Sequence, residues 1–332
     1  MTTTDPATEG APAAAHRGRR DESENDVREG GAWTRAQAIK NAMLYALARA
    51  AIAIASALPA RVVRALGRGL GLFAYAVLAR PRRIAFANLA RVFPERAPED
   101  RRAIARRAYV TLGGHLGDTV ALLRGDRSRL VVAEAAVRTL QDARAEGNGV
   151  VFASAHLGPW EAVAAALVAH GVPLTTLARE SYDPRMTRLY DRLRGAHAVR
   201  VIYRARPGAA ARILRALRDG EVLGAPMDLR SRVASIDVPF LGHPAPTAVG
   251  PARIALRTGA AVVVGTAAPG AGAAICVTAT RIATADLTRD DAGERELTTR
   301  INAEISQRIL ALPDAWVWMH ERWPQARSRV RA

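Results

Sequence analysis

His156 and Glu161 are separated by four residues in a segment that directly follows a short apolar run at 149–155. Such a run, bounded by a glycine turn and a histidine, is typical of a buried parallel strand. Ligands of open α/β sheets bind beyond the carboxyl ends of the strands, so His156 stands where a reactive group is expected. Pro159 suits the start of a helix, and Glu161 falls in its first turn. We expect Glu161 to accept a hydrogen bond from one ring nitrogen and to leave the other free as a base.

This pair supplies the base and the orienting carboxylate of a catalytic triad, without a serine or cysteine nucleophile. The nucleophile would therefore be a hydroxyl that the substrate brings. A structural interpretation is also open, in which Glu161 complements the helix dipole and His156 merely ends the strand. The spacing alone is a weak motif, and the position after a buried strand favours the catalytic interpretation.

Charged residues also follow two other expected strands at the same edge of the sheet. Arg179 and Glu180 end the next strand, where an arginine could grip a phosphate or a carboxylate through two hydrogen bonds. Asp228 closes a third strand and could supply a second carboxylate to His156. The alternatives are an ordinary surface arginine and an aspartate that initiates a turn. Asp237 is interpreted as a turn residue.

Three of the five tryptophans lie in one segment near the end of the chain, residues 316–324, which also contains His320 and Arg322. These aromatic rings could form an interfacial belt, the wall of an acyl pocket, or a strand that closes the core, and composition slightly favours the last. The remaining histidines have no acidic partner at a useful spacing and are expected to be structural or at the surface: His16, His115, His170, His197 and His243.

The periodicity of the chain predicts the elements that position these residues. Apolar runs predict further strands at 174–178, 199–203, 222–226, 236–240, 261–266 and 274–280. Three- and four-residue spacings predict helices at 159–170, 184–194, 209–218, 247–258 and 294–312, and a helical region at 84–145. This alternation indicates a single α/β domain with a mixed, largely parallel central sheet flanked by helices. The chain has no G-x-G-x-x-G or Walker loop, so nucleotide binding of those types lacks support.

The N-terminal part has a different character. Residues 1–32 carry no apolar period and are expected to form a disordered tail. Residues 41–60 are long enough to span a bilayer, but Arg49 near the centre costs at least about 2.5 kcal/mol on insertion scales. We favour a pair of amphipathic helices in the membrane interface over a spanning helix, and a soluble helical hairpin is the alternative.

Composition limits the partners and the kinds of site. The net charge is +17, and all but one of the 48 lysines and arginines are arginines, the exception being Lys40. This surplus should attract an anionic partner such as phospholipid headgroups, an acidic carrier protein or nucleic acid. Nucleic acid is not expected, because the arginines are spread over the whole length rather than interleaved with aromatics on one face. The single cysteine, Cys276, excludes a disulfide framework and a cysteine-based zinc site, and no metal or cofactor is expected.

Six blocks of the sequence together resemble the bacterial lipid A biosynthesis (lauroyl/myristoyl) acyltransferases, within the superfamily that carries an H-x4-D/E motif. These blocks are 149–161, 177–195, 224–228, 238–242, 250–259 and 318–323. The resemblance implies a glycerolipid acyltransferase-like fold at the cytoplasmic face of the inner membrane. It divides the chain into a tail (1–32), a membrane-associating helical region (33–80), an acyltransferase domain (81–324) and a basic tail (325–332).

The resemblance also implies roles for the residues at matching positions. His156 would be the base, Glu161 its orienting partner and Asp228 a further acid near the ring. Arg179 would bind a substrate phosphate, and the neighbouring Glu180 belongs to the same block. His320 and Arg322, in the last block, would also contact substrate.

The activity that the resemblance implies is transfer of an acyl chain from acyl-carrier protein or acyl-CoA, as co-substrate, to a hydroxyl of a glycolipid or lysolipid. A lipid A precursor, a phosphatidylinositol mannoside, an ornithine lipid and a lysophospholipid all remain open as acceptors. Two alternative functions are a thioesterase, in which the same residues activate water to hydrolyse the thioester, and a non-catalytic protein that binds anionic lipid.

Overall fold

The computed structural model describes residues 31–127, 129–230, 233–270 and 274–323. At its centre is a seven-stranded sheet with the order β1-β9-β8-β2-β5-β3-β4. Its strands are β1 (Leu130–Val132), β2 (Val150–Ser154), β3 (Leu174–Ala178), β4 (Arg200–Tyr203), β5 (Val222–Pro226), β8 (Ala261–Pro269) and β9 (Ile275–Ile282). Only the β8–β9 pair is antiparallel among these strands. The expected mixed, largely parallel sheet is confirmed.

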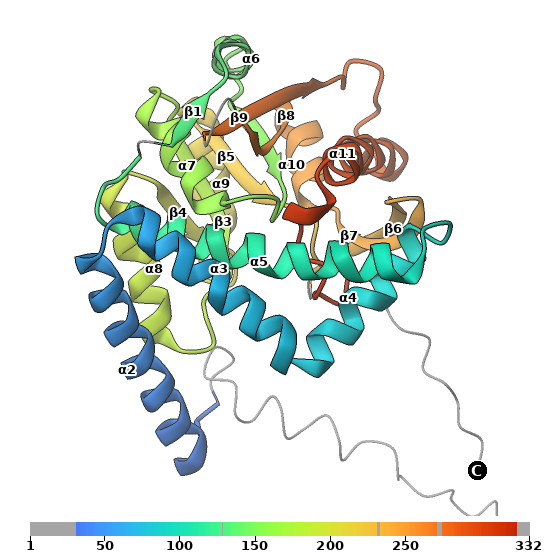
Figure 1. Cartoon of the computed structure of the whole chain (residues 1–332). Coiled ribbons are helices and arrows are strands. Elements are labelled where there is room, and N and C mark those ends of the chain that lie inside the picture. Colours follow the sequence, from blue (N-terminus) through green and yellow to red (C-terminus); the bar gives the residue numbers. More distant parts are fainter. Residues whose placement is uncertain (1–30, 128, 231–232, 271–273, 324–332) are drawn as a thin grey trace, which may run out of the picture.

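Helices cover both faces of this sheet (Figure 1). One face carries α6 (Glu134–Ala145), α7 (Trp160–Ala169) and α8 (Pro184–Ala196), and the other carries α9 (Ala209–Arg218), α10 (Gly250–Thr258) and α11 (Asp291–Ala311). Alternate residues of β2 belong to the two cores: Phe152 packs in the cluster with α6 and α7, and Val151 packs in the cluster with α11. A strand buried on both faces explains the uninterrupted apolar run in its sequence.

Two parts of the α/β domain differ from the expectation. The helical stretch expected at 84–145 is interrupted by the short edge strand β1. Residues 243–248 form β7, which pairs with β6 (Ser235–Phe240) in a separate two-stranded sheet, so the following helix begins at Gly250 and not at Thr247. This strand was not predicted because it contains prolines. Proline cannot donate a hydrogen bond to a sheet and occurs mainly in edge strands. Asp237 lies inside β6, opposite Pro246, so its interpretation as a turn residue was wrong.

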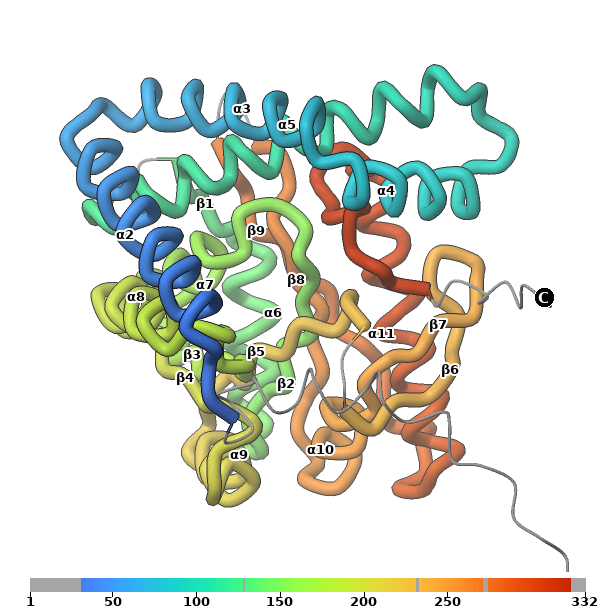
Figure 2. Tube along the Cα trace, turned by 90° about the horizontal axis from the view of Figure 1, so that it is seen from below, coloured from blue at the N-terminus to red at the C-terminus, as the bar shows by residue number. Residues whose placement is uncertain are grey.

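Among the described residues, four helices precede the central sheet: α2 (Arg35–Ala57), α3 (Ala60–Val77), α4 (Ala79–Val92) and α5 (Pro98–Leu123). In both views α3 lies along α5 (Figures 1 and 2). Their backbones touch at glycines: a Cβ added to Gly67 would lie 2.2 Å from the carbonyl oxygen of Gly113, and one added to Gly71 would lie 2.1 Å from that of Tyr109. A larger residue at these positions would push the helices apart, so α3 is fixed firmly to the domain.

The outward surface of these first helices is apolar. The exposed large side chains include Ile39, Met43, Leu44, Leu47 and Ile54 of α2, and Leu66, Leu70, Leu72, Phe73 and Val77 of α3. Helix α2 is long and apolar enough to cross a membrane, and little of it is buried. α3 and α4 meet at an angle of 89°. Such exposed apolar faces suggest that this end of the molecule associates with a membrane.

The N-terminus of α2 rests on the loop after β3. Trp33 stacks on Tyr182, with ring centroids 5.8 Å apart, and the guanidinium of Arg185 lies over the ring of Tyr45. The expected tails, 1–32 and 325–332, lie almost entirely outside the described residues, as does His16.

Candidate active site

The parallel register of the sheet brings His156 and Asp228 together. Ser154, the last residue of β2, pairs with Pro226, the last residue of β5. His156 and Asp228 therefore each lie two residues beyond the same rung of the ladder, at the carboxyl edge of the sheet.

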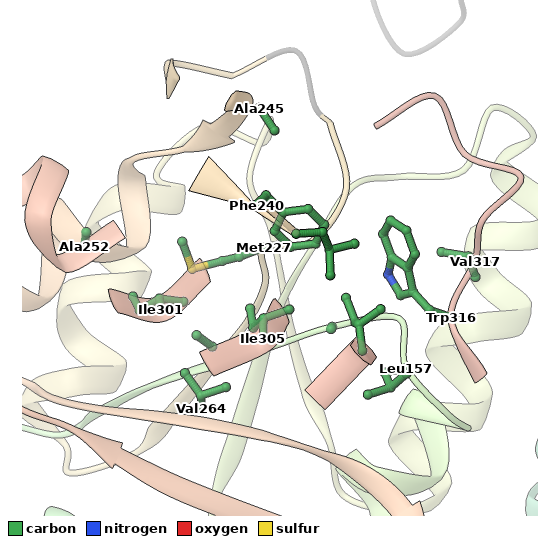
Figure 3. Close-up of a cluster of buried hydrophobic side chains, with 14 of the residues drawn as sticks. Leu157, Met227, Phe240, Ala245, Ala252, Val264, Ile301, Ile305, Trp316 and Val317 are labelled. Carbon is green, nitrogen blue, oxygen red and sulfur yellow. The ribbon is translucent and has the colours of Figure 1, made fainter. Parts of the chain in front are cut away.

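The backbone on either side of these residues is anchored in the core. Leu157 and Met227, their chain neighbours, are each 1% exposed and point into the buried cluster shown in Figure 3. The turn from β2 into α7 passes through Gly158, which has φ of +75°. A Cβ there would lie 2.7 Å from that of Ala267, so both the conformation and the space require glycine. These anchors fix the direction of the histidine.

Asp228 accepts three hydrogen bonds at the end of β5. Its Oδ1 lies 2.9 Å from Nδ1 of His156, and its Oδ2 accepts the backbone N–H of His156 and the indole N–H of Trp316, each at 2.8 Å. Burial of this fully enclosed carboxyl would raise its pKa, but the charge and hydrogen bonds of His156, with that of Trp316, hold the pKa below its ordinary value. Asp228 is therefore ionised at neutral pH.

An ionised Asp228 decides which nitrogen of His156 can act as a base. A carboxylate only accepts hydrogen bonds, so Nδ1 of the ring carries a proton and Nε2 keeps its lone pair. Burial acts to lower the pKa of His156, but the charge and hydrogen bond of Asp228 and the charge of Glu161 raise it above the ordinary value. The side chain is 25% exposed, and its ring makes a T-shaped contact with Trp160, 4.9 Å between centroids.

Glu161 does not make the hydrogen bond that its spacing led us to expect. Its two carboxylate oxygens accept N–H groups of Arg194 on α8, at 2.6 and 2.9 Å. The first turn of α7 directs Glu161 toward α8, where this ion pair is largely buried. Asp228 holds the ring instead, and Glu161 acts on His156 through its charge.

The C-terminal segment completes the site, but it is not a strand. It begins with the short 3-10 helix Pro313–Ala315 and meets the turn after β2 at a single bridge between Leu157 and Trp316. Asn88, buried on α4, donates to the backbone oxygens of Trp318 and His320, both at 2.8 Å. This contact joins the N-terminal helices to the active-site edge.

Arg322 does not reach the site, contrary to our expectation that it contacts substrate. It is fully buried, donates to the hydroxyl of Thr247 at 2.7 Å and to the carbonyl of Pro246, and lies over the ring of Phe240. Burial lowers the pKa of Arg322 to about 10. Its guanidinium fastens β7 to the C-terminal segment.

A cleft of about 1170 Å³ opens over His156. Part of its lining is apolar and comes from α7 and the sheet: Phe152, Val163, Ala164, Leu167, Leu174 and Gly224. The lining also includes three arginines, Arg179, Arg204 and Arg230, and His320. Burial lowers the pKa of His320, so this ring is neutral at pH 7. Glu180 lies outside the lining of the cleft and pairs with Arg206, at 2.6 Å.

Sequence reasoning missed Arg194 and the hydrogen bond from Trp316. Nothing in a chain with this many arginines distinguishes Arg194, because its pairing with Glu161 depends on how α7 and α8 pack. Trp316 lies in a cluster of tryptophans that stood out, yet its bond to a carboxylate 88 residues away has no local signature.

The arrangement fits transfer of a group to a hydroxyl: an oriented imidazole lines a cleft whose lining also includes a group of apolar side chains and three arginines. No curated protein matches the chain. The model of the bacterial lipid A biosynthesis acyltransferase family matches residues 34–325, which confirms the resemblance that the motifs indicated. Because this match covers well over half of the sequence, the chain belongs to the bacterial lipid A biosynthesis acyltransferase family.

Proposed function

We propose that this acyltransferase moves a fatty acyl chain from the thioester of acyl-carrier protein or acyl-CoA to a hydroxyl of a membrane glycolipid or lysolipid, with His156 as general base. The observation that carries the proposal is the His156–Asp228 pair, in which Asp228 holds Nδ1 of a ring that lines the cleft. The acceptor we favour is a lipid A precursor, in keeping with the family. A phosphatidylinositol mannoside, an ornithine lipid or a lysophospholipid is the alternative.

The reaction needs no covalent enzyme intermediate. Nε2 of His156 takes the proton of the acceptor hydroxyl while its oxygen forms a bond to the thioester carbonyl carbon. The tetrahedral intermediate then expels the thiolate, which takes the proton from the imidazolium, leaving an ester and a free thiol. Asp228 stabilises the positive ring between these two transfers. General base catalysis of this type contributes about 10²- to 10⁴-fold, and positioning of the two substrates contributes much of the rest.

The apolar part of the cleft lining would bind the acyl chain. It combines the ring of Phe152 with Leu167 and Leu174, beside Gly224. Burial of a methylene group is worth about 0.8 kcal/mol, so a long chain would be held firmly here.

The exposed faces of α2 and α3 bring the cleft to the lipid. Side chains such as Leu47, Leu70 and Phe73 would enter the interface, and the arginine surplus would favour anionic headgroups. Because acyl-carrier protein and acyl-CoA are cytosolic donors, this surface would lie on the cytoplasmic face of the inner membrane.

The test compares lipids of cells that carry the wild-type chain, His156→Ala or no copy. Mass spectrometry should find one lipid species heavier by a single acyl chain in the wild type alone. His156→Ala should lower turnover of purified protein by at least about a hundredfold and leave its melting temperature within the range of surface variants. Unchanged lipids, or near-normal turnover of His156→Ala, would overturn the proposal.

The same preparation separates a transferase from a thioesterase. An acyl-CoA donor is supplied with and without extracted membrane lipid, and free fatty acid is measured together with lipid ester. A transferase releases little free acid when acceptor is present, whereas a thioesterase releases acid at the same rate in both cases.

A further inference from the structure

The segment that forms β4 and α9 carries positive charge and no negative charge. Residues 199–218 contain six arginines and neither aspartate nor glutamate. Arg200 and Arg206 pair with acids outside the segment, at 2.6 Å each. A third arginine, Arg204, lines the cleft. The other three lie on α9: Arg212, Arg215 and Arg218.

The three arginines of α9 lie at the surface of the molecule. The buried residues of this helix recur at three- and four-residue intervals and include Ile213 and Leu217 of the core cluster. The arginines lie outside this buried stripe, and all three are exposed. None of them forms an ion pair with a residue in the described ranges. Their charge is therefore available to a partner.

An exposed apolar side chain lies among these cations. Leu214 is 44% exposed and precedes Arg218 by four residues, so the two are neighbours on the helix surface. Interfaces between proteins combine apolar groups at the centre with polar and charged groups at the rim. The area of one helix face is small, which suits a complex that forms and dissociates at each turnover.

Helix α9 starts at the edge of the sheet where the cleft lies. β4 ends at Tyr203, and α9 begins at Ala209 and runs back against β4 and β5. The end of β4 lies three strands from β2, or roughly 14 Å at ordinary strand spacing. Helices α9 and α3 lie on opposite sides of the central sheet (Figure 2). A partner on α9 would therefore not compete with a membrane for the exposed apolar face of α3.

We propose that the outward face of α9, formed by Arg212, Leu214, Arg215 and Arg218, docks the acyl-carrier protein that delivers the thioester. This inference rests on the proposed function and deepens it, because it selects the protein donor and gives its binding surface. The carrier is an acidic protein, so opposite charges meet, and such attraction speeds the encounter and orients the partners.

The carrier differs from acyl-CoA in what it can cover. Its prosthetic arm holds the thioester away from the folded protein, so the body can rest on α9 while the arm extends into the cleft. Acyl-CoA carries the same pantetheine arm but has no protein body to contact α9. Charge on this helix should therefore affect only the protein donor.

The experiment uses two donors with the same acyl chain: acyl-carrier protein loaded with a lauroyl group, and lauroyl-CoA. Binding is measured by titration calorimetry on purified full-length protein in detergent, in a His156→Ala background so that no turnover intervenes. The double variant Arg212→Glu/Arg215→Glu is compared with Arg102→Glu/Arg106→Glu. Arg102 and Arg106 are exposed on α5 and form no ion pair among the described residues, so both variants change the net charge equally.

We expect the α9 variant to weaken binding of the loaded carrier about tenfold or more and to leave binding of lauroyl-CoA unchanged. Added salt should weaken binding of the carrier to the parent protein more steeply than to the α9 variant. The α5 variant should bind both donors as the parent does. Equal melting temperatures establish folding, and Arg212→Gln/Arg215→Gln replaces the charge reversal if that variant is less stable.

Unchanged binding of the carrier to the α9 variant would overturn the docking site, as would equal weakening by the α5 variant. Weaker binding of lauroyl-CoA would also contradict it, because the substitution would then act on the cleft. Sedimentation with phosphatidylglycerol vesicles tests contact with lipid instead. Loss of vesicle binding in the α9 variant, with carrier binding intact, would make this face a membrane contact.

Acyl transfer to extracted membrane lipid is assayed separately with His156 intact. The α9 variant should have a higher KM for the loaded carrier and an unchanged kcat/KM for lauroyl-CoA. No transfer by the parent from either donor would refute the proposed function, whatever α9 binds. Transfer from the carrier with the same KM in parent and α9 variant would refute the docking site alone.

Discussion

The candidate active site contains two buried carboxylates that differ in their partners. Asp228, after β5, holds an imidazole and an indole, whereas Glu161, in the first turn of α7, holds the guanidinium of Arg194. An imidazole can gain and lose a proton near neutral pH, but a guanidinium cannot. The Asp228 pair can therefore take part in proton transfer, and the Glu161 pair is a permanent ion pair that acts on His156 through its charge. The partner, rather than the spacing in the motif, decides what each acid does.

The largest effect expected from this difference is on turnover in Asp228→Asn. The amide keeps the shape but can donate to Nδ1, which favours the wrong tautomer of His156 and removes the charge that stabilises the imidazolium. We expect turnover to fall by about 10²- to 10⁴-fold, measured by acyl transfer from a thioester donor. A variant that keeps more than a tenth of wild-type turnover, with an unchanged melting temperature, would show that Asp228 does not orient the base.

Glu161→Gln should instead have its main effect on stability. The change leaves the guanidinium of Arg194, which is only 16% exposed, without a charged partner. Breaking a buried pair from one side costs about 3–5 kcal/mol in the free energy of unfolding. Denaturant titration of Glu161→Gln, Arg194→Met and the double variant measures this.

The double variant provides the control. Removing both charges should recover a large part of the loss, because no unpaired charge then remains. Additive losses would mean that the two side chains do not stabilise the fold as a pair. The same cycle on an exposed pair, Arg138 and Glu134 on α6, should give a coupling of only about 0.2–1 kcal/mol.

The pH dependence of activity distinguishes the two acids in another way. A general base must be neutral, and Asp228 together with Glu161 raises the pKa of His156, so activity should rise with pH through a value above the ordinary 6.5. Removing either negative charge makes the imidazolium less stable, so the acid limb of kcat/KM should move to lower pH in both variants. The shift should be larger in Asp228→Asn, which also loses the hydrogen bond. An acid limb that stays in place in Asp228→Asn would refute the electrostatic account.

Much of the fold could be predicted because local signals and long-range packing agree there. The strands β3 and β5 and the helix α9 have the predicted limits, and β2 was recognisable because both of its faces are buried. β7 was missed because its prolines conceal an edge strand, and β1 was missed because three residues are too few to interrupt a helical period. In each case the pairing partner, which the sequence does not reveal, decides the structure.

For the candidate site, the sequence could predict where the residues lie on the sheet but not which hydrogen bonds they make. The positions of His156, Asp228 and Arg179 at one edge of the sheet could be predicted because these residues follow buried strands, and parallel strands end at one edge. The sequence could not show that Asp228, and not Glu161, makes the hydrogen bond to His156. This pairing depends on β5 lying next to β2 and on α8 packing against α7. Arg322 was misassigned for a similar reason, since its burial depends on β7.

The smallest expected effect concerns Trp316→Phe, which removes one of the three hydrogen bonds to Asp228 and keeps the aromatic ring. Without the indole N–H, the pKa of Asp228 should rise toward its ordinary value and the carboxylate should hold the ring less firmly. We expect turnover to fall about tenfold, in keeping with one hydrogen bond to a charged group. Trp318→Phe is the matched control, because that indole donates at 2.6 Å to the carbonyl of Pro313 and not to the site. If both variants lose turnover equally, the effect comes from packing in the C-terminal segment. A loss confined to Trp316→Phe would mean that the indole helps to keep Asp228 ionised. The H-x4-E motif does not show this role, because its acid, Glu161, receives no hydrogen bond from Trp316.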